Sequence, residues 1–102
     1  MKTMFSISMD YHKAIAQALK VEQAADLLKR KKSALQERRG IISACWEGDD
    51  ADAYISKMQI LEEDFGKEIR NLTRAADAIR TIAQSTYDTE QRAIELARNR
   101  EY

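Results

Sequence analysis

The residue types that most often do chemistry in proteins are scarce in this chain. It contains one cysteine, Cys45, and one histidine, His12, among 102 residues. One cysteine excludes an intrachain disulfide, and a histidine with no second histidine or cysteine nearby does not make a metal site. The sequence has no glycine-rich loop and no carboxylate pair that a formed pocket would hold. We therefore expect no enzymatic activity, no metal, no cofactor and no small-molecule substrate.

An acidic cluster lies near the middle of the chain. Asp49, Asp50 and Asp52 follow directly after Trp46 and Gly48. Carboxylates are favourable in the first turn of a helix, where the helix dipole is positive, and an Asp at the N-cap accepts hydrogen bonds from unpaired backbone N–H groups. We interpret the cluster as the start of a helix that Asp49 or Asp50 caps.

A basic segment, KRKK at residues 29–32 followed by Arg38 and Arg39, is the feature that could bind nucleic acid. The acids Asp26 and Glu37 lie nearby, and the formal net charge of the chain is zero. Residues 1–40 carry nine Lys/Arg and four Asp/Glu, whereas residues 41–102 carry eight and thirteen. We expect the two halves to attract each other or a second copy, and no nucleic acid to bind. A nucleic-acid-binding hairpin is a less favoured alternative.

The composition indicates an all-α chain with few turns. It contains no proline and three glycines, where average usage predicts about five and about seven. No apolar run approaches the roughly 18 residues of a membrane-spanning helix. The N-terminal MKTMFSISMDYHK lacks the continuous apolar core and the cleavage site of a signal peptide. We expect one domain over residues 1–102 and no cleaved signal.

Apolar residues recur at spacings of three, four and seven on both sides of the acidic cluster, which is typical of helices. This pattern predicts a helix over about 9–45, capped by Ser8 or Asp10, and a turn at about 46–49. A second helix over about 50–90 and a charged C-terminal tail over about 91–102 complete the chain. Lys32 and Arg39 interrupt the first stripe, but their stems can cover apolar surface. The residues expected to form the hairpin and dimer core are Ile15, Leu28, Leu35, Ile42, Tyr54, Met58, Leu61, Phe65, Leu72 and Ile79.

So short a turn places the two helices antiparallel and side by side. Residues 29–32 should then lie near residues 62–64, and this pairing would set register more than stability, because exposed ion pairs contribute about 0–1 kcal/mol each. The apolar stripes are too wide for one neighbour, so a second hairpin must cover the remaining face. The predicted fold is an all-α, antiparallel helix-turn-helix hairpin that dimerises into a four-helix bundle.

The turn sequence Trp46-Glu47-Gly48, with Tyr54 eight residues after the Trp, resembles the WXG family of small helical-hairpin proteins related to the early secreted antigenic target. The resemblance covers residues from about 7 to 89. It implies export through a bacterial type VII (ESX) secretion system, folded as a homodimer or with a WXG-family paralogue, and a cytoplasmic stage before secretion. It also implies a membrane ATPase of the FtsK/SpoIIIE type as a partner, and a role as substrate or as adaptor for a larger co-secreted effector. Trp46 and Gly48 would belong to the surface that the export machinery reads, although Trp46 also suits a large apolar plug at the end of a bundle.

The family's second signal is a C-terminal Tyr-x-x-x-Asp/Glu. In this sequence Tyr87 is followed by Gln91 at i+4, and Glu90 stands at i+3, which is still a neighbouring position on a helix. The resemblance implies that Glu90 substitutes for the acid or that a partner supplies the signal, and the alternative is that both are ordinary surface residues. A generic intracellular coiled-coil scaffold shares the predicted fold, so only the turn and this motif separate it from an export substrate.

Overall fold

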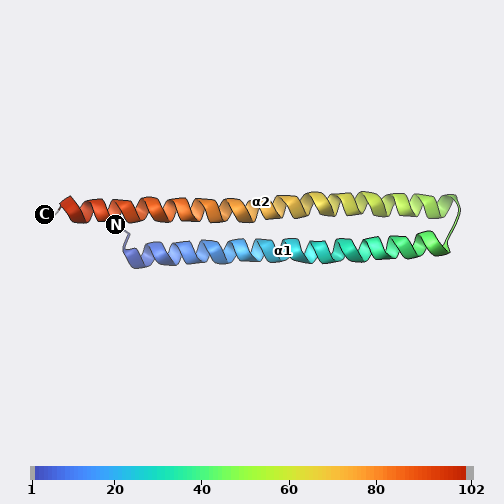
Figure 1. Ribbon diagram of the computed structural model, residues 1–102, viewed down its shortest axis with the longest axis horizontal. Helices are drawn as coiled ribbons and strands as arrows, with labels where there is room; N and C mark the ends of the chain where they lie inside the picture. The colour runs from blue at the N-terminus through green and yellow to red at the C-terminus, as the bar shows by residue number, and fades with distance from the viewer. Residues whose placement is uncertain (1, 101–102) are drawn as a thin grey trace. The chain divides into compact units, whose positions relative to one another are not determined.

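The computed structural model describes residues 2–100, which form two α-helices (Figure 1). Helix α1 runs Met4–Cys45 and helix α2 runs Asp49–Arg100. Residues 46–48 connect them, and the described residues contain no strand. The prediction of an all-α chain is confirmed. Within residues 2–100, neither helix has a stretch that is both long enough and apolar enough to cross a membrane.

The chain divides into two compact units, each built from one segment of each helix. The turn unit consists of residues 22–73. Its two helical segments are antiparallel because only residues 46–48 separate them, and Arg39 on α1 contacts Glu62 on α2. The turn unit therefore has the predicted helix-turn-helix form.

The terminal unit consists of the described residues up to Val21 and from Arg74 onward. Lys2 contacts Glu90, and Tyr11 contacts Gln84, so residue numbers rise along α1 as they fall along α2. The two segments of this unit are thus also antiparallel, as predicted. Dimerisation into a four-helix bundle stays a prediction.

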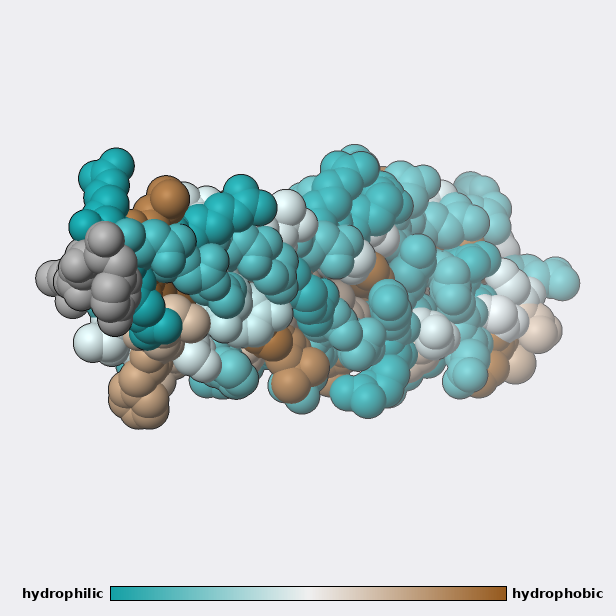
Figure 2. All heavy atoms as spheres, turned by 60° about the vertical axis from the view of Figure 1, so that its left-hand side comes forward, coloured by the Kyte–Doolittle hydropathy of each residue, from teal (hydrophilic) through white to brown (hydrophobic). Residues whose placement is uncertain are grey.

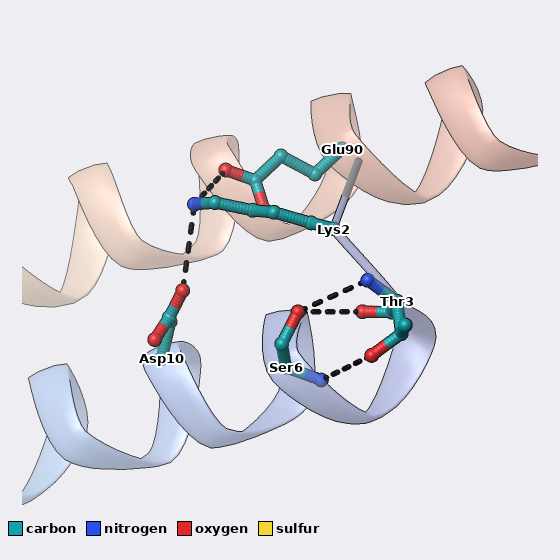
Figure 3. A network of polar contacts seen from close by, with 5 residues as sticks. All are labelled: Lys2, Thr3, Ser6, Asp10 and Glu90. Carbon is teal, nitrogen blue, oxygen red and sulfur yellow. Dashed lines mark hydrogen bonds and ion pairs between the residues drawn. The ribbon is translucent and has the colours of Figure 1, made fainter.

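Helix α1 begins at Met4 rather than near residue 9, because Thr3 caps it. The Ser6 N–H donates to Thr3 Oγ1 at 3.1 Å, and the Thr3 N–H donates to Ser6 Oγ at 3.0 Å (Figure 3). This reciprocal pairing is a capping box in which a serine takes the place of the usual Glu or Gln. Ser8 and Asp10, the predicted caps, lie inside the helix.

Helix α2 begins one residue before the predicted start and continues beyond the predicted end. The Gly48 carbonyl accepts a hydrogen bond from the Asp52 N–H at 3.0 Å, so Gly48 is the N-cap and the prediction of Asp49 or Asp50 was wrong. The three Asp side chains do lie in the first turn, as the dipole argument predicted. Residues 91–100 of the predicted tail are helical, with Arg98 and Arg100 compensating the dipole in the last turn. Residues 101 and 102 of that tail lie outside the described residues.

The buried side of α1 repeats with the spacing of a coiled coil. Its buried or half-buried residues alternate by four and by three, and include Ile7, Tyr11, Ala14, Ala18, Val21, Ala25, Leu28, Lys32, Leu35, Arg39 and Ile42. Helix α2 shows the same alternation at Ala51, Ile55, Met58, Glu62, Phe65, Ile69, Leu72, Ala76, Ile79 and Ala83. We call these two sets the seam. A repeat of 3.5 residues keeps one stripe of each helix facing its neighbour.

Most of the ten predicted core residues lie on or beside the seam. Met58 is buried, and seven others are half-buried: Ile15, Leu28, Leu35, Ile42, Phe65, Leu72 and Ile79. Tyr54 and Leu61 are exposed in the single chain, since each precedes a seam position by one residue. Their predicted place in a dimer core stays a prediction. The most completely buried side chains are small, at Ala18 and Ala51.

Candidate functional site: the turn and the C-terminal motif

The Trp46-Glu47-Gly48 turn depends on the backbone of its glycine. Gly48 has a φ of 114°, a conformation that residues with a side chain rarely adopt. A Cβ atom added there would meet nothing within 4 Å. Backbone conformation, and not lack of space, is therefore what requires glycine at this position.

The backbone of Trp46 is hydrogen-bonded to α1, whereas its side chain is partly exposed to solvent. Its N–H donates to the Ile42 carbonyl at 2.9 Å, which continues the helical hydrogen bonding one residue past α1. The indole ring lies 6.1 Å from the ring of Tyr54, tilted by 53°. Trp46 remains 45% exposed. The turn thus presents an aromatic pair to solvent, which is the kind of anchor that dominates recognition surfaces.

The C-terminal motif residues Tyr87 and Glu90 both face the first turns of α1. The Tyr87 ring lies 5.3 Å from the ring of Tyr11, and Tyr87 is half-buried. The Lys2 ammonium donates to Glu90 Oε1 at 2.9 Å and lies 3.4 Å from Asp10 Oδ2 (Figure 3). Hydrogen bonding to Glu90, and secondarily to Asp10, raises the pKa of Lys2. Both motif side chains therefore contact residues from the N-terminal part of the chain.

These features occur in a chain that a family model covers over most of its length. The model described as proteins of 100 residues with WXG matches residues 6–91, which include the turn and both motif residues. The chain belongs to the WXG100 family. Members of this family are known as small secreted proteins of type VII secretion, and they commonly form homodimers or pair with paralogues. Comparisons with curated proteins and with solved structures returned no match.

In this WXG100 protein a partly buried ion pair lies in the seam of the turn unit. The Arg39 Nε donates to Glu62 Oε2 at 2.7 Å and Nη2 donates to Oε1 at 3.2 Å, so the contact is bidentate. Glu62 is only 5% exposed. The hydrogen bonds to Glu62 raise the pKa of Arg39. A two-pronged contact of this kind fixes the stagger of the two helical segments.

The predicted pairing of residues 29–32 with residues 62–64 was right about the neighbourhood and wrong about the partner. Lys32 lines a surface groove with Glu62 and Glu63. The ion pair to Glu62 comes instead from Arg39. The alternation of three and four residues places Arg39 in the seam, beside Glu62. Lys29 pairs with Asp26 on its own helix at 3.7 Å.

The single cysteine and the single histidine both lie on the surface. Cys45 is exposed at the end of α1. His12 is exposed, with Nδ1 2.7 Å from the Ser8 carbonyl and its ring edge-on to Tyr11. In the part of the chain that the structure describes, no group of three or more His, Cys, Asp or Glu side chains could hold a metal ion.

Proposed function

We propose that this WXG100 protein is exported by a type VII secretion system as a folded dimer, as a substrate or as an adaptor for a larger co-secreted effector. It acts by binding and not by catalysis. It is made in the cytoplasm and leaves the cell through this system, driven by a membrane ATPase of the FtsK/SpoIIIE type. The proposal rests on one observation above all. Trp46, nearly half exposed, stands beside a Gly48 whose backbone only glycine adopts easily, in the turn of a chain matched by the family model.

The exposed apolar side chains support the dimer. In the turn unit Ile41, Tyr54 and Leu61 are exposed, and in the terminal unit Phe5 and Ile82 are exposed. Figure 2 shows hydrophobic side chains as separate brown areas among hydrophilic ones on one face of the molecule. Two helices can bury only the sides that face each other, so a second hairpin is the simplest way to cover the rest. The partner is a second copy or a paralogue.

The oligomeric state can be measured first, by light scattering and circular dichroism on the purified chain. A helical particle near twice 11.7 kDa would indicate a homodimer. A partly unfolded monomer would indicate that another chain supplies the missing half of the bundle.

The export role is tested by replacing the turn residues in a bacterium that has a type VII system. We expect Trp46→Ala to lower the ratio of protein in the medium to protein in the cells by about tenfold, as for loss of a hot-spot aromatic residue. Gly48→Ala should also lower export while the protein stays a helical dimer. Trp46→Phe, which keeps an aromatic ring, and Gly40→Ala, a glycine substitution inside α1, serve as matched controls.

Normal export of folded Trp46→Ala and Gly48→Ala proteins would contradict the proposal. The turn would then be purely structural, and the coiled-coil scaffold would become the preferred interpretation.

A further inference from the structure

The N-terminal residue Lys2 lies across the C-terminal motif. Its ammonium is 2.9 Å from Glu90 Oε1, and the Glu90 side chain is only 25% exposed. The two residues are 88 positions apart in the sequence. The acid that would have to be read by a receptor is therefore already bound to a cation from the same chain.

Local structure holds Lys2 in this position. The reciprocal hydrogen bonds between Thr3 and Ser6 order the backbone immediately after Lys2 (Figure 3). Asp10, one further turn along α1, supplies a second carboxylate 3.4 Å from the ammonium. Lys2 thus bridges one carboxylate on each helix of the terminal unit.

The tyrosine of the motif is engaged by the same part of α1. Tyr11 packs against Tyr87 with ring centroids 5.3 Å apart, and its hydroxyl donates to Gln84 Oε1 at 3.1 Å. Lys2, Tyr87 and Glu90 together line one groove, whose floor includes Ile7 and Ala83. Lys2 and the α1 residue Tyr11 therefore contact both side chains of the motif.

We propose that Lys2 is a strap over the export motif, and that a cationic side chain of the receptor must displace it from Glu90 before the motif is read. This inference rests on the proposed export function, and it concerns how access to the Tyr87/Glu90 motif is regulated. The Lys2 side chain is 55% exposed, and exposed ion pairs are weak, so the strap opens readily. An arginine of the receptor could replace it with a two-pronged contact that a lysine cannot make.

The test compares export of the full chain carrying Lys2→Ala with that of the unchanged protein at early times. We expect the ratio of exported to cellular protein to rise about two- to fivefold, the range for removing one exposed ion pair. Lys2→Arg, which keeps the charge, should show no rise. Lys13→Ala removes an exposed lysine of α1 and should also show none.

A second variant isolates the contact itself. In the purified Glu90→Gln protein, the pKa of the Lys2 ammonium, measured by NMR, should fall toward its ordinary value of 10.5.

Unchanged or reduced export of Lys2→Ala would overturn the strap. A reduction would mean that Lys2 positions Glu90 for recognition instead of covering it. Failure of the proposed export function can be distinguished from failure of the strap, because in that case Trp46→Ala would also leave export unchanged.

Discussion

The two units of the molecule hold their helices together in different ways. In the terminal unit the buried side chains are apolar and mostly small, and include Ala18, Ala76 and Ala83. In the turn unit the buried set includes Glu62, paired with Arg39 inside the seam. The terminal unit places its polar cross-helix contacts at the rim, where Lys2 meets Glu90 and Tyr11 meets Gln84.

This difference separates two tasks of a helical hairpin. Small side chains allow close packing but specify stagger weakly, because one alanine fits where another does. A charged pair inside the seam tolerates no slip, since a shift of one turn would leave a buried carboxylate without its partner. We infer that the ion pair of the turn unit sets the register of its two helical segments. The terminal unit depends instead on the close fit of its small buried side chains.

The largest expected effect comes from enlarging a buried alanine in the terminal unit. Ala18 is fully buried, so Ala18→Leu should lower the free energy of unfolding by about 1–3 kcal/mol through overpacking. Ala16→Leu, two residues away and exposed, should change it by less than about 0.5 kcal/mol. Urea unfolding of both variants measures the difference, and equal values would show that the terminal unit does not depend on fit.

The next prediction concerns the ion pair of the turn unit. Arg39→Met leaves the nearly buried Glu62 carboxylate unpaired, whereas Glu62→Met leaves an arginine that is 30% exposed and can turn to water. Arg39→Met should therefore have the lower urea midpoint of the two, and the double Met variant should recover most of the loss. A double variant no more stable than Arg39→Met would mean that the pair does not act as a unit.

A smaller effect should distinguish the glycine of the turn from a glycine of the helix. Gly48→Ala should lower the free energy of unfolding by about 1–2 kcal/mol, because its φ of 114° is unfavourable for a residue with a side chain. Gly40→Ala, where an added methyl also meets nothing within 4 Å, should raise it by about 0.5–1 kcal/mol. Thermal unfolding by circular dichroism checks both signs, and a stabilising Gly48→Ala would contradict the conformational argument.

The smallest expected effect is at Gly66 in the seam region of the turn unit. A Cβ atom there would lie 3.1 Å from Lys32 Nζ, the far end of a flexible side chain that can move aside. Gly66→Ala should therefore stabilise the protein by about 0.5 kcal/mol, less than Gly40→Ala. A loss of stability, seen in the same thermal experiment, would show that Lys32 is held as firmly as Arg39.

Local features of the sequence were sufficient for the helices, the turn and the family. The absence of proline, the 3–4 spacing of apolar residues and the Trp46-x-Gly48 turn with its acidic first turn all act within a few residues. These interactions are the same whether or not the helices have met. The start of α1 is determined in the same local way, because the Thr3–Ser6 pairing joins residues only three apart in the sequence.

Only the tertiary structure decided which side chains meet across the helices. The sequence by itself offered residues 29–32 as partners of residues 62–64, but the rotation and stagger of the helical segments brought Arg39 to Glu62 instead. Likewise, the sequence around Glu90 does not predict its contact with Lys2, because that contact depends on how two antiparallel segments align. Helix propensity and dipole energies fall off within a turn or two, whereas cross-helix pairing depends on how the two helical segments of each unit pack along the seam.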